Sequence, residues 1–188
     1  AICEFIGNLG IIHQCLCDYT KSLNYLEQAL AIAKDIGNNL QIGNNLMNIG
    51  TVYYSLKKIS NALDYYKQAL VIVKVLDDKL LIGRNHMNIG NWYFALGDYP
   101  KALNYYEHRL VIVKKLDDNT LIGDILMNIW NVYYLLGDYP KALDLYEEAL
   151  VIEKQVSNKI SIGNTLSNIG LIYHELGNYF KALSYQVQ

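Results

Sequence analysis

Residues 82–121 read IGRNHMNIGNWYFALGDYPKALNYYEHRLVIVKKLDDNTL, and this stretch decides the fold. Its first part has apolar side chains at spacings that fit a helix better than a strand, at Ile82, Met87, Ile89, Trp92, Tyr93 and Leu96. Gly97 then suits a left-handed helix end, Asp98 offers a capping carboxylate, and Pro100 is tolerated in the first turn of a new helix. The helical period returns at Ala102, Leu103, Tyr106, Leu110 and Val113. The stretch therefore predicts an αα-hairpin.

The same pattern recurs every forty residues along the whole chain. Four glycines keep this spacing, with Trp130 in the remaining place: Gly10, Gly50, Gly90 and Gly170. So do the tyrosines that follow them, with His13 in register before them: Tyr53, Tyr93, Tyr133 and Tyr173. A matching alanine stands at Ala62, Ala102, Ala142 and Ala182. A fixed period of this length is typical of a stacked repeat array rather than of a globular domain with one core.

The repeat predicts an all-α chain built as an α-solenoid of stacked antiparallel helix pairs. We expect the first helix of each pair near 2–16, 40–56, 80–96, 120–136 and 160–176. The second helix is expected near 20–35, 60–76, 100–116, 140–156 and 179–188. No linker separates the repeats, so residues 1–188 are predicted to form one array, with repeats at 1–41, 42–81, 82–121, 122–161 and a partial one at 162–188.

These residues resemble the tetratricopeptide repeat family. Its Gly-x-x-Tyr and Ala-x3-aromatic spacing is matched by Gly50 with Tyr53 and by Ala62 with Tyr66, and again in later repeats. The usual closing proline is replaced by lysine, for example Lys74, which suits longer helices. The chain is similar to the long-repeat branch found in Pins-type scaffolds, kinesin light chains and bacterial arrays. The resemblance implies a right-handed superhelix whose first helices line a concave groove. A HEAT or armadillo array has a similar period but not this spacing.

Composition excludes several functional classes. The net charge of −2 gives no basic face for nucleic acid, and no apolar run reaches the ~20 residues that span a bilayer. The chain has three cysteines, an odd number, and all lie in the first repeat: Cys3, Cys15 and Cys17. This argues against a disulfide framework and favours a cytoplasmic protein. No pattern for a metal site, a cofactor or a catalytic group occurs, so we expect no enzyme.

An asparagine occupies the same helical position in every repeat: Asn8, Asn48, Asn88, Asn128 and Asn168. Asparagine is a poor mid-helix residue, and its amide can both donate to and accept from a peptide group. The resemblance implies that this row faces a ligand in the groove. The alternative is that each asparagine bonds to a neighbouring repeat and fixes the stacking. Helical offsets add further groove residues: Asn44, Arg84, Asp124, Asn91, Asn131, Tyr54, Phe94 and Tyr134. Met47, Met87 and Met127 fit either the groove or the core.

The sequence therefore predicts a protein-interaction module that binds a peptide or partner segment in a concave groove, as a scaffold or adaptor. Arg84 is the one basic residue suited to a carboxylate clamp, so such a clamp is not expected. One alternative is a regulatory or sensor arm of a larger signalling protein. Another is a structural spacer that associates end to end, because neither end carries a polar capping helix and the chain reads as a fragment of a longer array. Trp130 is expected to distort its repeat and to stack with Arg109 as a cation–π pair.

Overall fold

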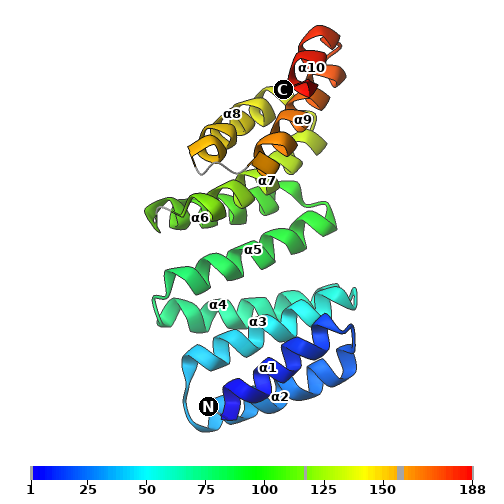
Figure 1. The fold of residues 1–188 in the computed structure, drawn as a ribbon. Helices are drawn as coiled ribbons and strands as arrows, with labels where there is room; N and C mark the ends of the chain where they lie inside the picture. Colours follow the sequence, from blue (N-terminus) through cyan, green and yellow to red (C-terminus); the bar gives the residue numbers. More distant parts are fainter. Residues whose placement is uncertain (1, 117, 156–158, 188) are drawn as a thin grey trace. The chain divides into compact units, whose positions relative to one another are not determined.

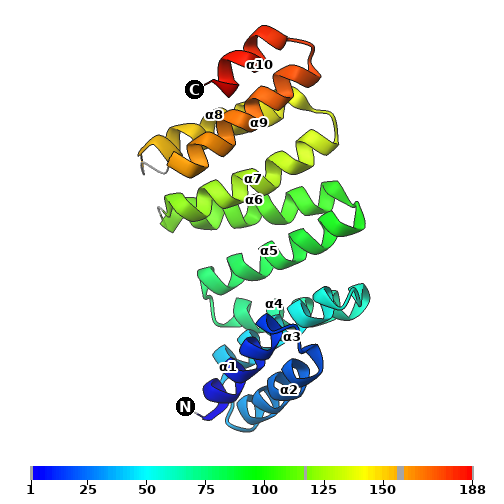
Figure 2. The ribbon, with the colours of Figure 1, turned by 45° about the vertical axis from the view of Figure 1, so that its right-hand side comes forward.

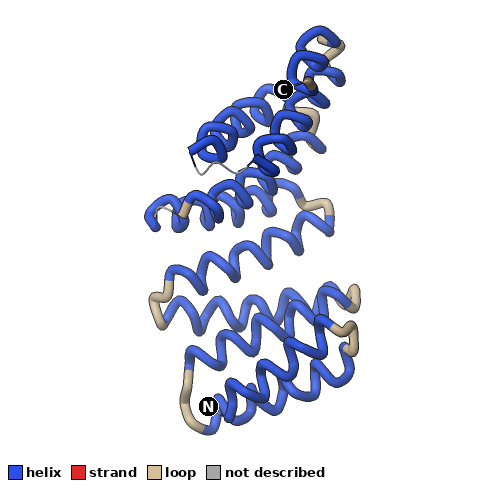
Figure 3. Tube along the Cα trace, viewed as in Figure 1, coloured by secondary structure: helices blue, strands red, loops and turns tan. Residues whose placement is uncertain are grey.

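The computed structural model describes residues 2–116, 118–155 and 159–187. Throughout these ranges the chain is helical, with short turns between helices and no strand (Figure 3). Its internal contacts divide it into two compact units, Ala1–Asp98 and Tyr99–Gln188. The prediction of an all-α fold built from antiparallel helix pairs is confirmed. A single array running through residues 1–188 stays a prediction.

The first unit contains five helices: α1 (Ile2–Cys15), α2 (Tyr19–Asp35), α3 (Asn39–Ser55), α4 (Ile59–Val75) and α5 (Lys79–Leu96). Each helix packs against the next one in the chain. In addition, α3 contacts both α1 and α5, so the first helices of successive repeats lie side by side (Figure 1). This arrangement brings one face of α1, α3 and α5 together.

The second unit contains α6 (Tyr99–Leu116), α7 (Asn119–Leu135), α8 (Tyr139–Gln155), α9 (Lys159–Glu175) and α10 (Tyr179–Gln186). Here too each helix packs on its successor, as the run from α6 to α10 in Figure 2 shows. In the described ranges, all ten helices begin and end within two residues of the predicted bounds. The expectations for Ala1, Val156 and Gln188 lie outside the described residues.

The helix boundaries are fixed by capping residues that recur every twenty positions. Six side chains accept a hydrogen bond from the backbone N–H three residues further on, as N-caps do: Asp18, Asn38, Asp78, Asp118, Asp138 and Asn178. The equivalent residue before α4 is Lys58, which makes no such bond. The preceding turns use a left-handed residue, for example Gly97 with φ of 82°.

The repeated glycine and alanine are positions of close helix approach. A Cβ atom added to Gly50 would lie 2.6 Å from Cε1 of Tyr66 and 3.3 Å from the carbonyl oxygen of Ala62. At the equivalent position in α7, the buried Trp130 packs its indole against Tyr146, with ring centroids 4.8 Å apart, and against Tyr134 at 5.3 Å. The helices around Trp130 therefore pack through aromatic rings rather than through direct backbone approach.

Several individual predictions for the core are settled by burial. His86 is buried, and His13, in register with the repeated tyrosines, stacks on Tyr25 with ring centroids 5.3 Å apart, so both histidines belong to the packed interior. Met47 is buried, so it belongs to the core and its groove interpretation is wrong. The cation–π pair of Arg109 with Trp130 stays a prediction.

Candidate functional site: an amide-lined pocket in the first unit

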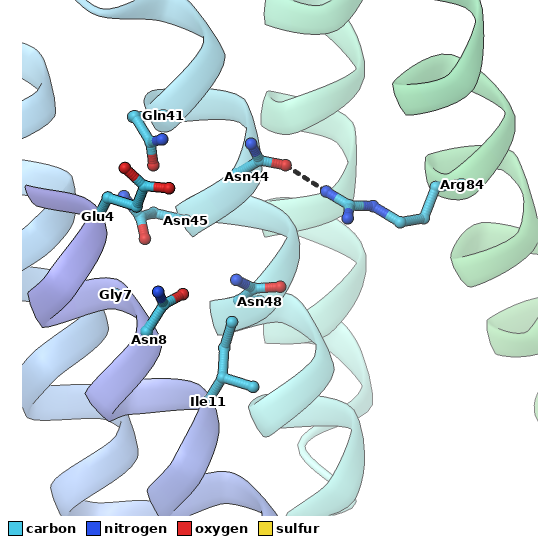
Figure 4. Close-up of a pocket in the computed structure, with 9 residues that line it drawn as sticks. All are labelled: Glu4, Gly7, Asn8, Ile11, Gln41, Asn44, Asn45, Asn48 and Arg84. Atoms are coloured by element: carbon cyan, nitrogen blue, oxygen red, sulfur yellow. Dashed lines mark hydrogen bonds between the residues drawn. The ribbon is translucent and has the colours of Figure 1, made fainter. Parts of the chain in front are cut away.

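A pocket of about 220 Å³ lies between α1, α3 and α5 of the first unit (Figure 4). We call it the amide pocket, because most of its polar side chains are amides. Four of the predicted groove residues line it, namely Asn8, Asn44, Asn48 and Arg84. Its remaining lining residues are Glu4, Gly7, Ile11, Gln41 and Asn45.

The helical period explains why these side chains meet. Glu4, Asn8 and Ile11 follow one another at three- and four-residue steps on α1, and Gln41, Asn44 and Asn48 do so on α3. Each trio therefore forms a stripe along one helix face. Because α1, α3 and α5 lie side by side, the two stripes border one pocket, and Arg84 reaches it from α5.

Hydrogen bonds inside the amide pocket leave much of its polar capacity unused. The Arg84 guanidinium donates to Oδ1 of Asn44 (Figure 4). Desolvation lowers the pKa of Arg84 and the nearby Asp78 carboxylate opposes this, so the group stays a cation at neutral pH. Among the described residues, Asn8 and Asn48 make no side-chain hydrogen bond with the protein. Their amides line the pocket with donors and acceptors available.

Two buried asparagines that sequence reasoning missed connect neighbouring helices. The amide of Asn45 donates to Sγ of Cys3, 3.8 Å away on α1, and that of Asn85 donates to the carbonyl oxygen of Tyr66 on α4 at 3.0 Å. In the first unit Asn45 and Asn85, one turn earlier on the helix than Asn48 and Asn88, therefore make the inter-helix contacts that were considered for the asparagine row. The available signal was the polar doublet that recurs at Asn44–Asn45 and Arg84–Asn85.

The second unit uses the equivalent position differently. Thr165 stands where Asn45 and Asn85 do, and its hydroxyl donates to the buried Glu153 carboxylate at 3.0 Å. Burial raises the pKa of Glu153, and the Thr165 hydrogen bond opposes that rise. Polar contacts at this helix position thus link successive repeats in both units.

The rest of the predicted asparagine row is placed outside the amide pocket. Asn88 is half-buried on α5 and makes no side-chain hydrogen bond with another described residue. Asn128 donates to the carbonyl oxygen of Asp124 on its own helix at 2.8 Å. Asn168 lies beside the Tyr146 hydroxyl, where it opposes the pKa rise that burial causes in that phenol.

The other predicted groove residues are partly or fully accessible on their first helices. Tyr54, Asn91 and Phe94 are half-buried in the first unit. In the second unit Asn131 and Tyr134 are half-buried and Asp124 is exposed. Tyr134 packs against Trp130 and Tyr139, with ring centroids 5.3 and 5.7 Å apart. None of these six residues lines the amide pocket.

A search of the described residues finds no cluster of His, Cys, Asp or Glu side chains with the arrangement of a metal site. Within the same part of the chain, every helix is too short or too polar to cross a membrane. The three cysteines are free thiols, with Cys3 buried and Cys15 and Cys17 exposed.

Comparison with known proteins identifies the repeat. The family model described as "Tetratricopeptide repeat" matches residues 2–74, 61–115, 81–155 and 121–188. No curated protein matches the sequence.

Solved structures share the fold at low sequence identity. One is BtubC (BKLC) from P. vanneervenii, at 20% identity and TM-score 0.87, covering 97% of this chain and 76% of that one. A signal transduction ATPase (STAND) protein with a tetratricopeptide repeat sensor, from Pyrococcus horikoshii, gives 20% identity and TM-score 0.88, covering 96% of this chain and 28% of that one. A Rap protein complexed with Competence and Sporulation Factor gives 16% identity and TM-score 0.77, covering 97% of this chain and 61% of that one.

Proposed function

The chain belongs to the tetratricopeptide repeat family, and from this we propose that it is a non-enzymatic interaction module that binds an extended segment of a protein partner. We assign that binding to the amide pocket of the first unit. Tetratricopeptide repeats are generally interaction modules, which supports the general class. The cytoplasm is the proposed compartment, in keeping with three free thiols.

One observation carries the proposal: two amides of the pocket, Asn8 and Asn48, have no hydrogen-bond partner among the described residues although they lie in a concavity. A peptide group offers one N–H donor and one carbonyl acceptor, and an asparagine side chain pairs with both. Backbone recognition of this kind requires an extended segment, because a helix has already used its backbone groups.

The test removes these two amides and measures affinity and stability on the same variant. Peptides selected by the wild-type chain from a random phage-displayed library serve as ligands. Each lost hydrogen bond is worth ~0.5–1.5 kcal/mol, so Asn8→Ala combined with Asn48→Ala should weaken binding by about tenfold to a hundredfold in calorimetry. The melting temperature should hold or rise, because alanine is the better helix former.

Asn128→Ala is the matched control, because Asn128 already bonds to its own helix. It should leave affinity unchanged. If the double variant instead melts earlier and binds as tightly as the wild type, Asn8 and Asn48 are stacking residues and the proposal fails.

The alternative of a sensor arm within a larger signalling protein is supported by the similarity to the STAND protein, of which this chain spans 28%. In that case the amide pocket holds a segment of the same polypeptide. Sequencing the complete gene decides between them, because a fused catalytic domain would favour the sensor arm.

End-to-end association is a second candidate with its own observation. Ile2, Phe5 and Ile12 form an exposed apolar stripe on α1, whereas the equivalent residues of α3 are buried against the preceding repeat, as Ile42 and Val52 show. Exposed apolar side chains at Leu183 on α10 and at Val187, directly after that helix, offer a surface of the same character. Contiguous apolar surface of this kind favours association.

A further inference from the structure

Ring stacking between the two helices of a repeat is a recurring feature of this protein. His13 stacks on Tyr25 with centroids 5.3 Å apart and planes at 14°. Tyr53 stacks on Tyr65 at 5.4 Å and 12°. Tyr173 stacks on Tyr185 at 5.6 Å and 16°. The ring from the second helix stands at the equivalent position each time.

The fourth repeat breaks this pattern. The first ring is present as Tyr133, but Leu145 stands where Tyr25, Tyr65 and Tyr185 stand elsewhere. A pocket of about 250 Å³ lies there, between α6, α7 and α8 of the second unit. We call it the Tyr133 pocket. Tyr133, Leu110, Ile129 and Leu145 form its apolar surface, and Glu107, Lys141 and Asp144 form its charged rim.

The first unit shows what fills the equivalent space when the tyrosine is present. Eighty residues earlier, Glu27, Leu30, Ile49, Tyr53 and Asp64 occupy the positions of Glu107, Leu110, Ile129, Tyr133 and Asp144. There the ring of Tyr65 stacks on Tyr53. Its pKa is raised by burial first, and then by Tyr53 and by the Glu27 carboxylate, which places that carboxylate near the phenol. The same surroundings in the second unit lack the ring.

The rim of the Tyr133 pocket is negative. Within the described part of the chain, neither Glu107 nor Asp144 has an ion-pair partner. Lys141 is paired with Asp138 at 2.7 Å, and its ammonium lies 5.2 Å from the Tyr133 ring centroid. The Lys141 charge is therefore balanced by Asp138, and two carboxylates remain uncompensated beside an apolar pocket.

We propose that the Tyr133 pocket binds an aromatic side chain of a partner protein, with a basic group next to the ring. The ring takes the place that Tyr65 fills in the first unit and stacks on Tyr133, as aromatic pairs do at centroid distances of ~4.5–7 Å. The adjacent cation pairs with Glu107 and Asp144. This surface lies on the second unit and is independent of the amide pocket.

Tyramine is the probe, because it joins a phenol ring to an ammonium group, and 4-hydroxyphenylacetate carries the same ring with a carboxylate instead. Both are titrated into the whole chain and followed by NMR. Tyramine should produce saturable shifts of the Tyr133, Leu110 and Leu145 resonances. The anionic probe should bind at least several times more weakly, because it meets the two carboxylates.

Leu145→Tyr is the decisive variant, because it restores the residue that the other repeats carry. It should reduce tyramine affinity at least tenfold, about 1.4 kcal/mol, while the melting temperature stays the same or rises. Glu107→Gln with Asp144→Asn keeps the pocket volume and should remove the preference for tyramine over 4-hydroxyphenylacetate. Tyr65→Leu is the reciprocal control and should open a second tyramine site beside Glu27 and Asp64.

Three results overturn the proposal. The first is tyramine binding that Leu145→Tyr leaves intact, and the second is equal affinity for the two probes. The third is a dependence of the NMR resonances of the Tyr133 pocket on protein concentration before any probe is added. That result would show that a second copy of the chain occupies the pocket. Failure of the amide pocket to bind peptides leaves all three measurements unaffected.

Discussion

At the scale of single residues, glycine acts in two opposite ways in this chain. Gly50 lies where α3 meets the second helix of its repeat, and there is no room for a Cβ beside the buried Tyr66. Gly123 lies inside α7, and an added Cβ would have no described atom of another helix within 4 Å. The first glycine is therefore required by packing, and the second only increases the freedom of the unfolded chain.

Substitution by alanine should separate these two cases. Gly50→Ala gains ~1 kcal/mol of helix propensity but overpacks the contact with Tyr66, which costs ~1–3 kcal/mol. The difference is a loss of about 0–2 kcal/mol of folding stability, and we expect a value of about 2 kcal/mol. Gly123→Ala should stabilise the protein by about 1 kcal/mol. Urea unfolding followed by circular dichroism measures both. Equal effects of the two substitutions would contradict the packing argument.

At the scale of helices, the capping residues set where each helix begins. Their twenty-residue spacing follows from two helices of similar length in each forty-residue repeat. An N-cap satisfies one of the four backbone N–H groups that an α-helix leaves unpaired at its start. Helix α4 differs from these, since Lys58 makes no capping hydrogen bond and places a cation near the positive end of the helix dipole.

Lys58→Asp should supply the missing cap. We expect a gain of about 1 kcal/mol, since N-cap substitutions typically change stability by ~0.5–2 kcal/mol. The lost contact of Lys58 with the Tyr53 ring, 5.9 Å from its centroid, offsets only part of this gain. Asp138→Ala, which removes an existing cap on α8, is the control and should cost a similar amount. Thermal melting of both variants gives the comparison, and a less stable Lys58→Asp protein would show that the capping account of α4 is wrong.

At the scale of the whole molecule, each second helix packs its apolar face on the first helix of the following repeat. The exposed stripe on α1 and the exposed side chains on α10 have the character of the two partners in such a contact. Such a contact is heterologous, and where its rotation does not close a ring it produces chains of increasing length rather than a defined dimer.

Sedimentation velocity at increasing protein concentration tests this end-to-end contact. The wild-type chain should show a mass that grows with concentration, because the exposed apolar stripe is removed from water on association. Phe5→Asp should abolish this growth, since it puts a charge in the centre of the stripe on α1. Val71→Asp, at an exposed position on α4, is the matched control and should leave association unchanged. A wild-type monomer at every concentration would rule out the spacer candidate.

The repeat pattern was sufficient to predict the helices and, within each unit, the packing of each helix on its successor. Helix period, turn residues and caps are local properties, so a short stretch of sequence is enough to predict them. The forty-residue repetition shows the same local pattern in each repeat, which supports each prediction independently. The glycine at position 50 likewise indicated a close contact, because its cost inside a helix has no local explanation. The sequence by itself thus determined the fold class, the helix boundaries and the family resemblance.

Only the tertiary structure decided which polar residues are buried and which remain available. Asn45 and Asn48 are the same residue type on the same helix, but their side chains have different neighbours. Asn45 bonds to a second helix, whereas Asn48 lines the amide pocket without a hydrogen bond to the described residues. Met47 went to the core for the same reason. The Tyr133 pocket is lined by residues from three helices, with Leu145 at the position that holds a tyrosine in the other repeats. Such outcomes depend on the angle and distance between helices, which the pattern of one helix does not specify.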